Sequence, residues 1–211
     1  MHVVSVNISE PEAIKINSRV VTTGIFKHPV AGKVQVSAQG LAGDTIADKK
    51  YHGGLDQAVY LYSAEDYAWW ADQLQRDVSM GTFGDNLTLS SFGPDPLRVG
   101  DRFQINSLLL EVTFPRIPCA TLGARMEGAA FVKRFVEAQR PGAYARVLAA
   151  GELQAGDPVE MLPTADGFPT IVELYELWHA KQHDSELLHR GLAAPISERA
   201  RATLQLWAER A

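Results

Sequence analysis

Short apolar runs separated by glycine-containing turns fill the first 162 residues, and this alternation limits the folds open to the chain. The runs are rich in β-branched and aromatic residues, which favour strands. They cover residues 3–8, 20–26, 33–38, 58–62, 108–113 and 144–148. Gly-Asp pairs at 43–44, 84–85, 100–101 and 156–157 suit turns between strands. The pattern predicts a mostly β, α+β chain whose strands close into a barrel.

Two helices are expected to interrupt these strands. One begins at Ser63, because Ser63 and Asp66 form an N-terminal capping pattern ahead of a helical apolar repeat. The other covers residues 128–138, where the apolar side chains fall on one face.

The composition changes at residues 163–167, which suit a short linker. Beyond it, Ile171, Leu174, Tyr175 and Trp178 recur at helical spacing, and residues 196–207 repeat the pattern. We therefore predict two parts, a barrel over residues 1–162 and a three-helix extension over residues 168–211. Exposed apolar faces on such an extension would also suit a homodimer.

Charge and hydropathy limit the classes of partner that the chain can bind. The net charge of −5 and the absence of a long basic run argue against nucleic-acid binding. No apolar run approaches the roughly 18–20 residues that span a bilayer, and the N-terminus lacks the pattern of a secretory signal. We expect a cytoplasmic protein without membrane contact.

The single cysteine, Cys119, follows an apolar strand in the segment Phe-Pro-Arg-Ile-Pro-Cys. The two prolines keep the backbone extended, so Cys119 should lie on a stiff loop just past the end of the strand. Arg116 is three residues away, and a nearby cation favours the thiolate, which is a soft metal ligand and a nucleophile. The alternative is a buried cysteine that only fills space.

Two further segments place polar side chains next to glycines. His52 and Asp56 flank Gly53-Gly54, which suits either a polar ligand pocket or a tight turn. Asn86 follows Gly84-Asp85 and can offer both a donor and an acceptor to a heterocycle, although turn chemistry also explains it.

Three more side chains are candidates for anion or ligand binding. Tyr144 and Arg146 should share one face of a strand, since side chains alternate with a period of two. Arg146 and Lys27 can each bind a phosphate through charge-assisted hydrogen bonds; the alternative for both is a solvated surface position.

Several common functional motifs are absent from the sequence. It contains no P-loop, no G-x-G-x-x-G fingerprint, no H-E-x-x-H pair and no G-x-S-x-G elbow. His179 and His183 stand at i, i+4 in the tail, where solvation explains such a pair as well as metal binding does.

The segments together resemble the MOSC domain family, in particular its YiiM-like branch. The matching pieces occur in the family's order: TGIFK at 23–27, GLAGD at 40–44, HGGLDQAV at 52–59, FGDNL at 83–87, VGD at 99–101, PRIPC at 115–119 and GAYARV at 142–147. The helical tail resembles the extension of that branch. Asp85 departs from the pattern, because the family usually has glutamate there.

The resemblance implies a closed barrel that holds a molybdenum–pterin cofactor in a cleft, with Cys119 as the metal-ligating thiolate. It also implies two groups of surrounding residues: Lys27, Arg116 and Arg146 to neutralise the cofactor phosphate, and His52, Asn86 and Tyr144 to line the cleft.

The activity implied by the resemblance is the reduction of N-hydroxylated bases or related compounds, such as 6-hydroxylaminopurine, to amines. No flavin or nicotinamide fingerprint is visible, so a separate flavin/NAD(P)H-dependent reductase would supply the electrons. Two alternatives stay open: a carrier or sensor that holds the cofactor without turnover, and a cofactor-free enzyme using Cys119 with His52 as base.

Overall fold

A computed structural model describes residues 1–47, 53–164 and 167–210. Its largest element is an eight-stranded sheet in the order β13-β9-β10-β11-β7-β8-β1-β4. Neighbouring strands are antiparallel except for the parallel pair β7–β8. The strands are β1 (Val3–Ile8), β4 (His28–Pro29), β7 (Val59–Ser63), β8 (Leu87–Leu89), β9 (Arg102–Ile105), β10 (Leu108–Pro115), β11 (Ala143–Ala149) and β13 (Glu160–Leu162).

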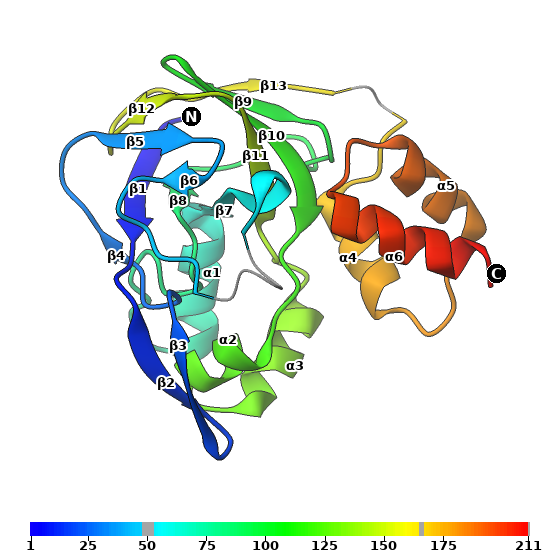
Figure 1. The fold of residues 1–211 in the computed structure, drawn as a ribbon, viewed down its shortest axis with the longest axis horizontal. Coiled ribbons are helices and arrows are strands. Elements are labelled where there is room, and N and C mark those ends of the chain that lie inside the picture. The colour runs from blue at the N-terminus through cyan, green and yellow to red at the C-terminus, as the bar shows by residue number, and fades with distance from the viewer. Residues whose placement is uncertain (48–52, 165–166, 211) are drawn as a thin grey trace.

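Two small sheets accompany the large one (Figure 1). One has three strands in the order β12-β5-β6, and the other is the hairpin of β2 and β3. Their bounds are β2 (Glu12–Ile16), β3 (Arg19–Thr23), β5 (Val34–Ser37), β6 (Gly40–Leu41) and β12 (Gly151–Leu153). The six strands expected from the sequence are all present, with ends shifted by no more than three residues.

The expected mixed α+β fold is confirmed, but the closed barrel is not. Within the described ranges, β13 and β4 stand at opposite edges of the large sheet, and the other strands form separate sheets instead of extending its ladder. An isolated bridge between His2 and Pro158 and a few backbone hydrogen bonds beside it link the start of β1 to the segment before β13. Strand patterning specifies alternating faces, whereas closure depends on which edges meet.

Six α-helices are present in the described part of the chain, and none of them is long and apolar enough to cross a membrane. They are α1 (Ala64–Leu74), α2 (Ala120–Arg125), α3 (Ala129–Ala138), α4 (Ile171–His179), α5 (Ser185–Ala193) and α6 (Glu198–Ala208), with a 3₁₀ turn η1 (Leu55–Gln57). The Ser63 side chain accepts a hydrogen bond from the Asp66 N–H at 3.0 Å, which confirms the expected cap of α1. The short helix α2 was not expected.

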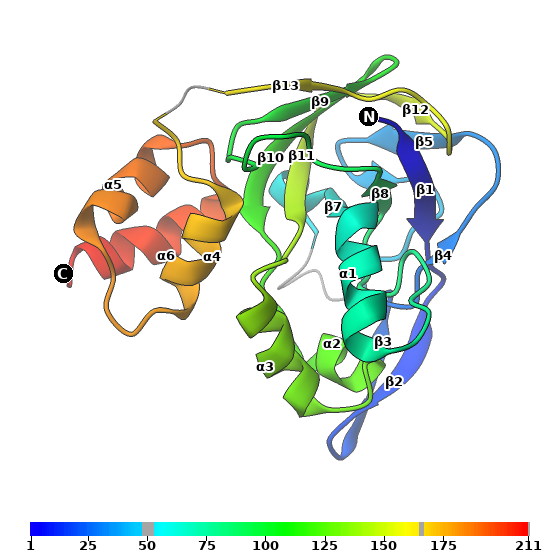
Figure 2. The ribbon, with the colours of Figure 1, turned by 180° about the vertical axis from the view of Figure 1, so that it is seen from behind.

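Helices α1, α2 and α3 gather at one end of the large sheet, beside the β2–β3 hairpin (Figures 1 and 2). An aromatic cluster fills the space between them. Trp70 and Phe135 stack at 5.7 Å, and Phe83 packs against both. Gly142 allows β11 to reach β7 here, because its φ is +63° and a Cβ would stand 2.4 Å from the Leu61 carbonyl oxygen.

The three helices expected in the tail are α4, α5 and α6, and they lie together beside β10 (Figure 1). Their buried residues Leu174, Leu188 and Leu204 belong to the same hydrophobic cluster as the core of the large sheet. The extension is therefore packed onto the sheet through a shared core. Its treatment as a separate domain stays a prediction.

Candidate functional site

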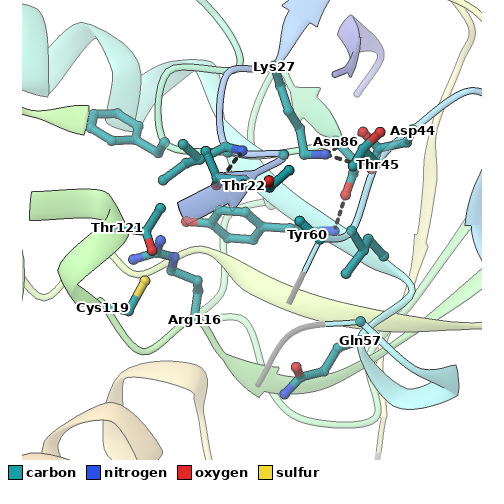
Figure 3. A pocket seen from close by; sticks show the side chains of 18 of the residues that line it. Thr22, Lys27, Asp44, Thr45, Gln57, Tyr60, Asn86, Arg116, Cys119 and Thr121 are labelled. Carbon is teal, nitrogen blue, oxygen red and sulfur yellow. Dashed lines mark hydrogen bonds and ion pairs between the residues drawn. The ribbon is translucent and has the colours of Figure 1, made fainter. Parts of the chain in front are cut away.

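A cavity of about 460 Å³ opens where the chain leaves the large sheet toward the helices and the hairpin (Figure 3). Its walls come from β2 and β3, the loops around residues 24–27 and 44–47, the start of β7, the loop at 83–86 and the connection from β10 to α2. Lining residues include Thr22, Thr23, Gly24, Lys27, Asp44, Thr45, Gln57, Tyr60, Asn86, Arg116, Cys119, Thr121 and Tyr144. Segments far apart in the sequence thus share one hollow.

Cys119 is placed at this cavity by the loop that the two prolines stiffen. Strand β10 ends at Pro115 and helix α2 begins at Ala120, so Cys119 is the extended residue that precedes the helix. Cys119 is half-buried and lines the cavity. Cys119 is therefore not a sealed packing residue, and its position just past the strand end agrees with the expectation.

Arg116 is the most deeply buried cation of the cavity, with 3% of its surface exposed. Its guanidinium lies close to Cys119 and Thr121 (Figure 3) and stands 5.9 Å from the centre of the Tyr60 ring. Burial acts to lower the pKa of Arg116, but nearby Tyr60, Cys119 and Tyr144 raise it overall, so the group stays charged.

One donor of this guanidinium is unused among the described residues: Nη1 of Arg116 is buried without a hydrogen-bond partner. A buried charged donor without a partner is costly, and an anion in the cavity would satisfy it. The residues present therefore fit an anionic cofactor that also needs a thiolate ligand.

Two tyrosines form the wall beside Arg116. Tyr60 and Tyr144 have ring centres 5.3 Å apart, and Arg116 is hydrogen-bonded to the Tyr144 side chain. Burial raises the pKa of Tyr144, and it raises that of Tyr60 strongly. Both phenols therefore keep their protons at neutral pH. The Tyr60 hydroxyl donates a hydrogen bond to the Pro141 carbonyl oxygen at 2.8 Å.

Lys27 and Asn86 line the cavity at the opposite end from Cys119 (Figure 3), where both are engaged with Asp44. The Lys27 ammonium lies 2.5 and 2.6 Å from the two carboxylate oxygens of Asp44. The Asn86 amide donates to Asp44 at 2.9 Å, and its oxygen accepts from the Tyr60 N–H at 3.1 Å. The charge of Lys27 is thus already balanced, and Asn86 serves mainly to join loops.

Arg146, which was expected to bind the cofactor phosphate, is not among the residues that line the larger cavity. Its guanidinium donates to the carbonyl oxygens of Pro195 and Ile196 at 2.9 and 3.2 Å and pairs with Asp56 at 3.0 Å. These contacts engage Nη2, whereas the buried Nε of Arg146 has no hydrogen-bond partner among the described residues. Alternation along β11 alone could not show that the C-terminal extension covers the strand at this point.

The Gly-Gly segment contributes less to the described site than the sequence suggested. His52 lies outside the described residues. Gly53 and Gln57 line the cavity. The Asp56 carboxylate instead faces Arg146 and accepts a hydrogen bond from the Glu198 N–H at 2.8 Å.

Asp85, the departure from the family pattern, is fully buried in a polar network that is not part of the lining. It accepts hydrogen bonds from Tyr67 at 2.5 Å and from Thr88 at 2.7 Å. Burial raises the pKa of Asp85, although these hydrogen bonds oppose the shift. Its side chain is held by these local partners and does not line the cavity.

Sequence reasoning missed the hydroxyl and amide groups of the lining: Thr22, Thr23, Thr45, Gln57 and Thr121. Gln57 lies inside the segment at 52–59 that carries part of the resemblance, and Thr121 stands two residues after Cys119, so both carried a weak signal. Thr23 opens the segment at 23–27 that carries part of the resemblance, whereas Thr22 carried no signal, since a β-branched residue is ordinary in a strand.

Among the residues that the structure describes, no cluster of three or more His, Cys, Asp or Glu side chains could hold a metal ion by itself. Of the described residues that line the cavity, Cys119 is the one soft ligand. A metal bound here would need most of its ligands from a cofactor, which agrees with a pterin that brings its own sulfur atoms.

A second, smaller cavity of about 250 Å³ adjoins the first under the C-terminal helices. It shares Gln57, Cys119 and Tyr144 with the first cavity. Its remaining walls are Phe114, Pro115, Ile117, Pro118, Trp178, Ser197, Arg199 and Ala200. Cys119 therefore lies at the junction of two hollows.

Comparison with known proteins places the chain in a family. The MOSC domain profile matches residues 48–160. The chain is 32% identical over 160 residues to the uncharacterized protein YflK of Bacillus subtilis, covering 76% of this chain and 72% of that protein. It is 28% identical to YiiM of Escherichia coli over 82% of this chain and 78% of YiiM.

A protein of Gibberella moniliformis named "Reductase" is 32% identical over 84% of this chain, and the match covers 32% of that longer protein. Among solved structures, YiiM of Geobacillus stearothermophilus superposes with a TM-score of 0.81 at 27% identity, over 98% of both chains. The matched length, the order of the motifs and the shared architecture agree: the chain belongs to the MOSC domain family, in its YiiM-like branch.

Proposed function

We propose that this chain binds a molybdenum–pterin cofactor in the larger cavity and reduces N-hydroxylated bases or related N-hydroxylated compounds to amines. The observation that carries the proposal is the pairing of a half-buried thiol, Cys119, with a buried guanidinium, Arg116, that has an unused donor. A thiolate ligand and an anion-binding cation are the two groups that such a cofactor requires from the protein.

Membership of the family supports the cofactor, because MOSC domains are generally associated with molybdenum cofactor binding. The relative named "Reductase" supports redox chemistry. When bound, the cofactor would supply the two-electron chemistry, while the protein supplies placement and electrostatics.

Each part of the cavity then has a definite task. Cys119 would hold the metal through its thiolate, and Arg116 would neutralise an anionic oxygen of the cofactor. Tyr144 stays a neutral phenol because burial raises its pKa, and its hydrogen bond with Arg116 keeps the guanidinium oriented. Lys27 and Asn86 would fix the far wall through Asp44.

The overall reaction balances with two electrons and two protons. The N–O bond of the substrate breaks, the nitrogen becomes an amine, and the oxygen leaves as water. We propose that a separate flavin/NAD(P)H-dependent reductase delivers the electrons.

The test is to make the protein with molybdate present and to measure molybdenum and pterin per chain in wild type, Cys119→Ser and Ala120→Ser. Ala120 is the exposed neighbour of Cys119 on the same helix N-terminus and does not line either cavity, so it controls for the added hydroxyl. We expect Cys119→Ser to lose molybdenum and N-hydroxy reduction, and Ala120→Ser to keep both.

Other outcomes would overturn the proposal in distinguishable ways. Full molybdenum in Cys119→Ser would remove Cys119 as the ligand. Molybdenum bound to wild type without reduction by any electron donor would indicate a carrier or sensor. Turnover by metal-free protein that depends on Cys119 and His52 would indicate a cysteine enzyme.

A further inference from the structure

Cys119 is accessible from two sides, because the larger and the smaller cavity share it together with Gln57 and Tyr144. The larger cavity is made by the sheet, the hairpin and the loops. The smaller one is closed by the C-terminal helices, through Trp178 of α4 and the first turn of α6. A second molecule bound in the smaller cavity can therefore contact a group bound at Cys119.

The walls of the smaller cavity are mostly apolar and include two aromatic rings. Phe114 and Trp178 meet edge to face with ring centres 5.2 Å apart, and Pro115 and Pro118 add rigid rings on the strand side. Flat aromatic surfaces favour flat aromatic ligands, because stacking buries area without losing side-chain freedom.

A few polar groups stand around this apolar surface. The Gln57 amide, the Tyr144 phenol and the Arg199 guanidinium belong to the lining, and Arg199 lies at the exposed edge of α6. Amide and guanidinium N–H groups are hydrogen-bond donors that match the ring nitrogens of a heterocycle. A few oriented polar groups in an apolar pocket are typical of small-molecule sites.

The two cavities also differ in volume, and this difference indicates which ligand each can hold. The larger, at about 460 Å³, lies within the roughly 300–1,000 Å³ of pockets for drug-sized ligands, and the smaller, at about 250 Å³, lies below it. The larger therefore suits the cofactor, and the smaller suits a compact ring system.

We propose that the smaller cavity holds the ring of a flat, neutral, aromatic N-hydroxylated substrate, with its N–OH group directed toward Cys119 and with Trp178 as the residue that positions the ring. This inference rests on the function proposed above. It assigns substrate selection to the C-terminal helices and cofactor binding to the sheet.

The test compares Trp178→Ala with Trp178→Phe and with Trp207→Ala. Trp207 packs against Trp178 at 5.1 Å and belongs to the same helices but lines neither cavity, so it controls for loosening of the extension. Each variant is assayed with an N-hydroxylated purine and with hydroxyurea, a small substrate without a ring. Molybdenum per chain is measured beside activity.

We expect Trp178→Ala to raise KM for the purine about tenfold to hundredfold, the range that loss of one base–aromatic stack produces. Its KM for hydroxyurea and its molybdenum content should match wild type. Trp178→Phe should restore most of the purine affinity, and Trp207→Ala should leave the KM ratio of the two substrates unchanged. An equal loss for both substrates, or the same selectivity change in Trp207→Ala, would overturn the inference.

A binding measurement keeps this inference separable from the proposed function. Calorimetry with adenine and molybdenum-free protein should show weaker binding in Trp178→Ala than in wild type and Trp207→Ala. If wild type binds no molybdenum and reduces nothing, the proposed function fails while this measurement still reports on the cavity. Equal adenine binding in all three proteins would overturn the ring site alone.

Discussion

The two ends of the larger cavity each contain a buried cation, and the two cations differ in what surrounds them. Lys27 has Asp44 at hydrogen-bond distance, and the Asp44 carboxylate is also held by Ser9 and Asn86. Arg116 lies among tyrosine rings, has no carboxylate within salt-bridge distance among the described residues, and keeps one donor unused. Equal charge therefore stands in different surroundings: the first cation is paired within the protein, and the second keeps a donor that no described residue uses.

The Asp44→Asn variant tests the stabilising end, and we expect the largest effect there. It leaves the Lys27 ammonium buried without a counter-charge, so the free energy of unfolding should fall by about 3–5 kcal/mol. Chemical denaturation measures the change. The double variant Lys27→Met/Asp44→Asn should recover part of the loss, because no buried charge remains. A fully stable Asp44→Asn with improved cofactor retention would instead make Lys27 a ligand-binding cation.

The Arg116→Met variant tests the end of the cavity where the buried cation keeps an unused donor. Loss of a charge-assisted hydrogen bond costs about 1.5–3 kcal/mol, so cofactor affinity should fall roughly ten- to hundredfold. The free energy of unfolding should change little, because the substitution also removes a desolvated charge. Pterin and molybdenum per chain report the first effect, and denaturation reports the second. A large fall in the free energy of unfolding with unchanged cofactor content would contradict the assignment of Arg116 to ligand binding.

The Arg146→Met variant is the matched control, because this arginine is also on the sheet side of the molecule but is held by the chain before α6. Its loss should lower the free energy of unfolding by about 1–2 kcal/mol, since it removes partly exposed charge-assisted bonds between β11 and the extension. Cofactor content should equal that of wild type. Cofactor loss as large as in Arg116→Met would show that Arg146 takes part in cofactor binding.

A half-exposed pair between Arg190 and Glu173 should matter least. Burial acts to raise the pKa of Glu173, but hydrogen bonds from Thr170 and Arg190 lower it overall. A lowered carboxyl pKa stabilises the fold above the unfolded value of 4.5, and this stability is lost as the pH falls through the folded value. Glu173→Gln should therefore cost about 0.5–1 kcal/mol near pH 7 and nothing near pH 2, measured by denaturation at both. A cost that is independent of pH would show that charge is not involved.

Much of the fold was predictable because its causes are local. Strand ends fell within a few residues of the expected positions, and the Ser63 cap began α1 as the sequence indicated. The position of Cys119 beyond a strand followed from the two prolines. Helix α2 was missed because it is short and carries no strong apolar repeat. His52 lies outside the described residues, so its role in the cleft stays a prediction.

The sequence by itself determined the family, the strand pattern and the single thiol, because these depend on residue order and on contacts within a few residues. Only the tertiary structure decided which cations are available, since a counter-charge such as Asp44 for Lys27, or a carbonyl such as that of Pro195 for Arg146, comes from a distant part of the chain. It also decided that Cys119 lies between two cavities, because one of them is closed by helices that begin more than fifty residues later. Burial and pairing are properties of packed neighbours, and neighbours in space are not neighbours in sequence.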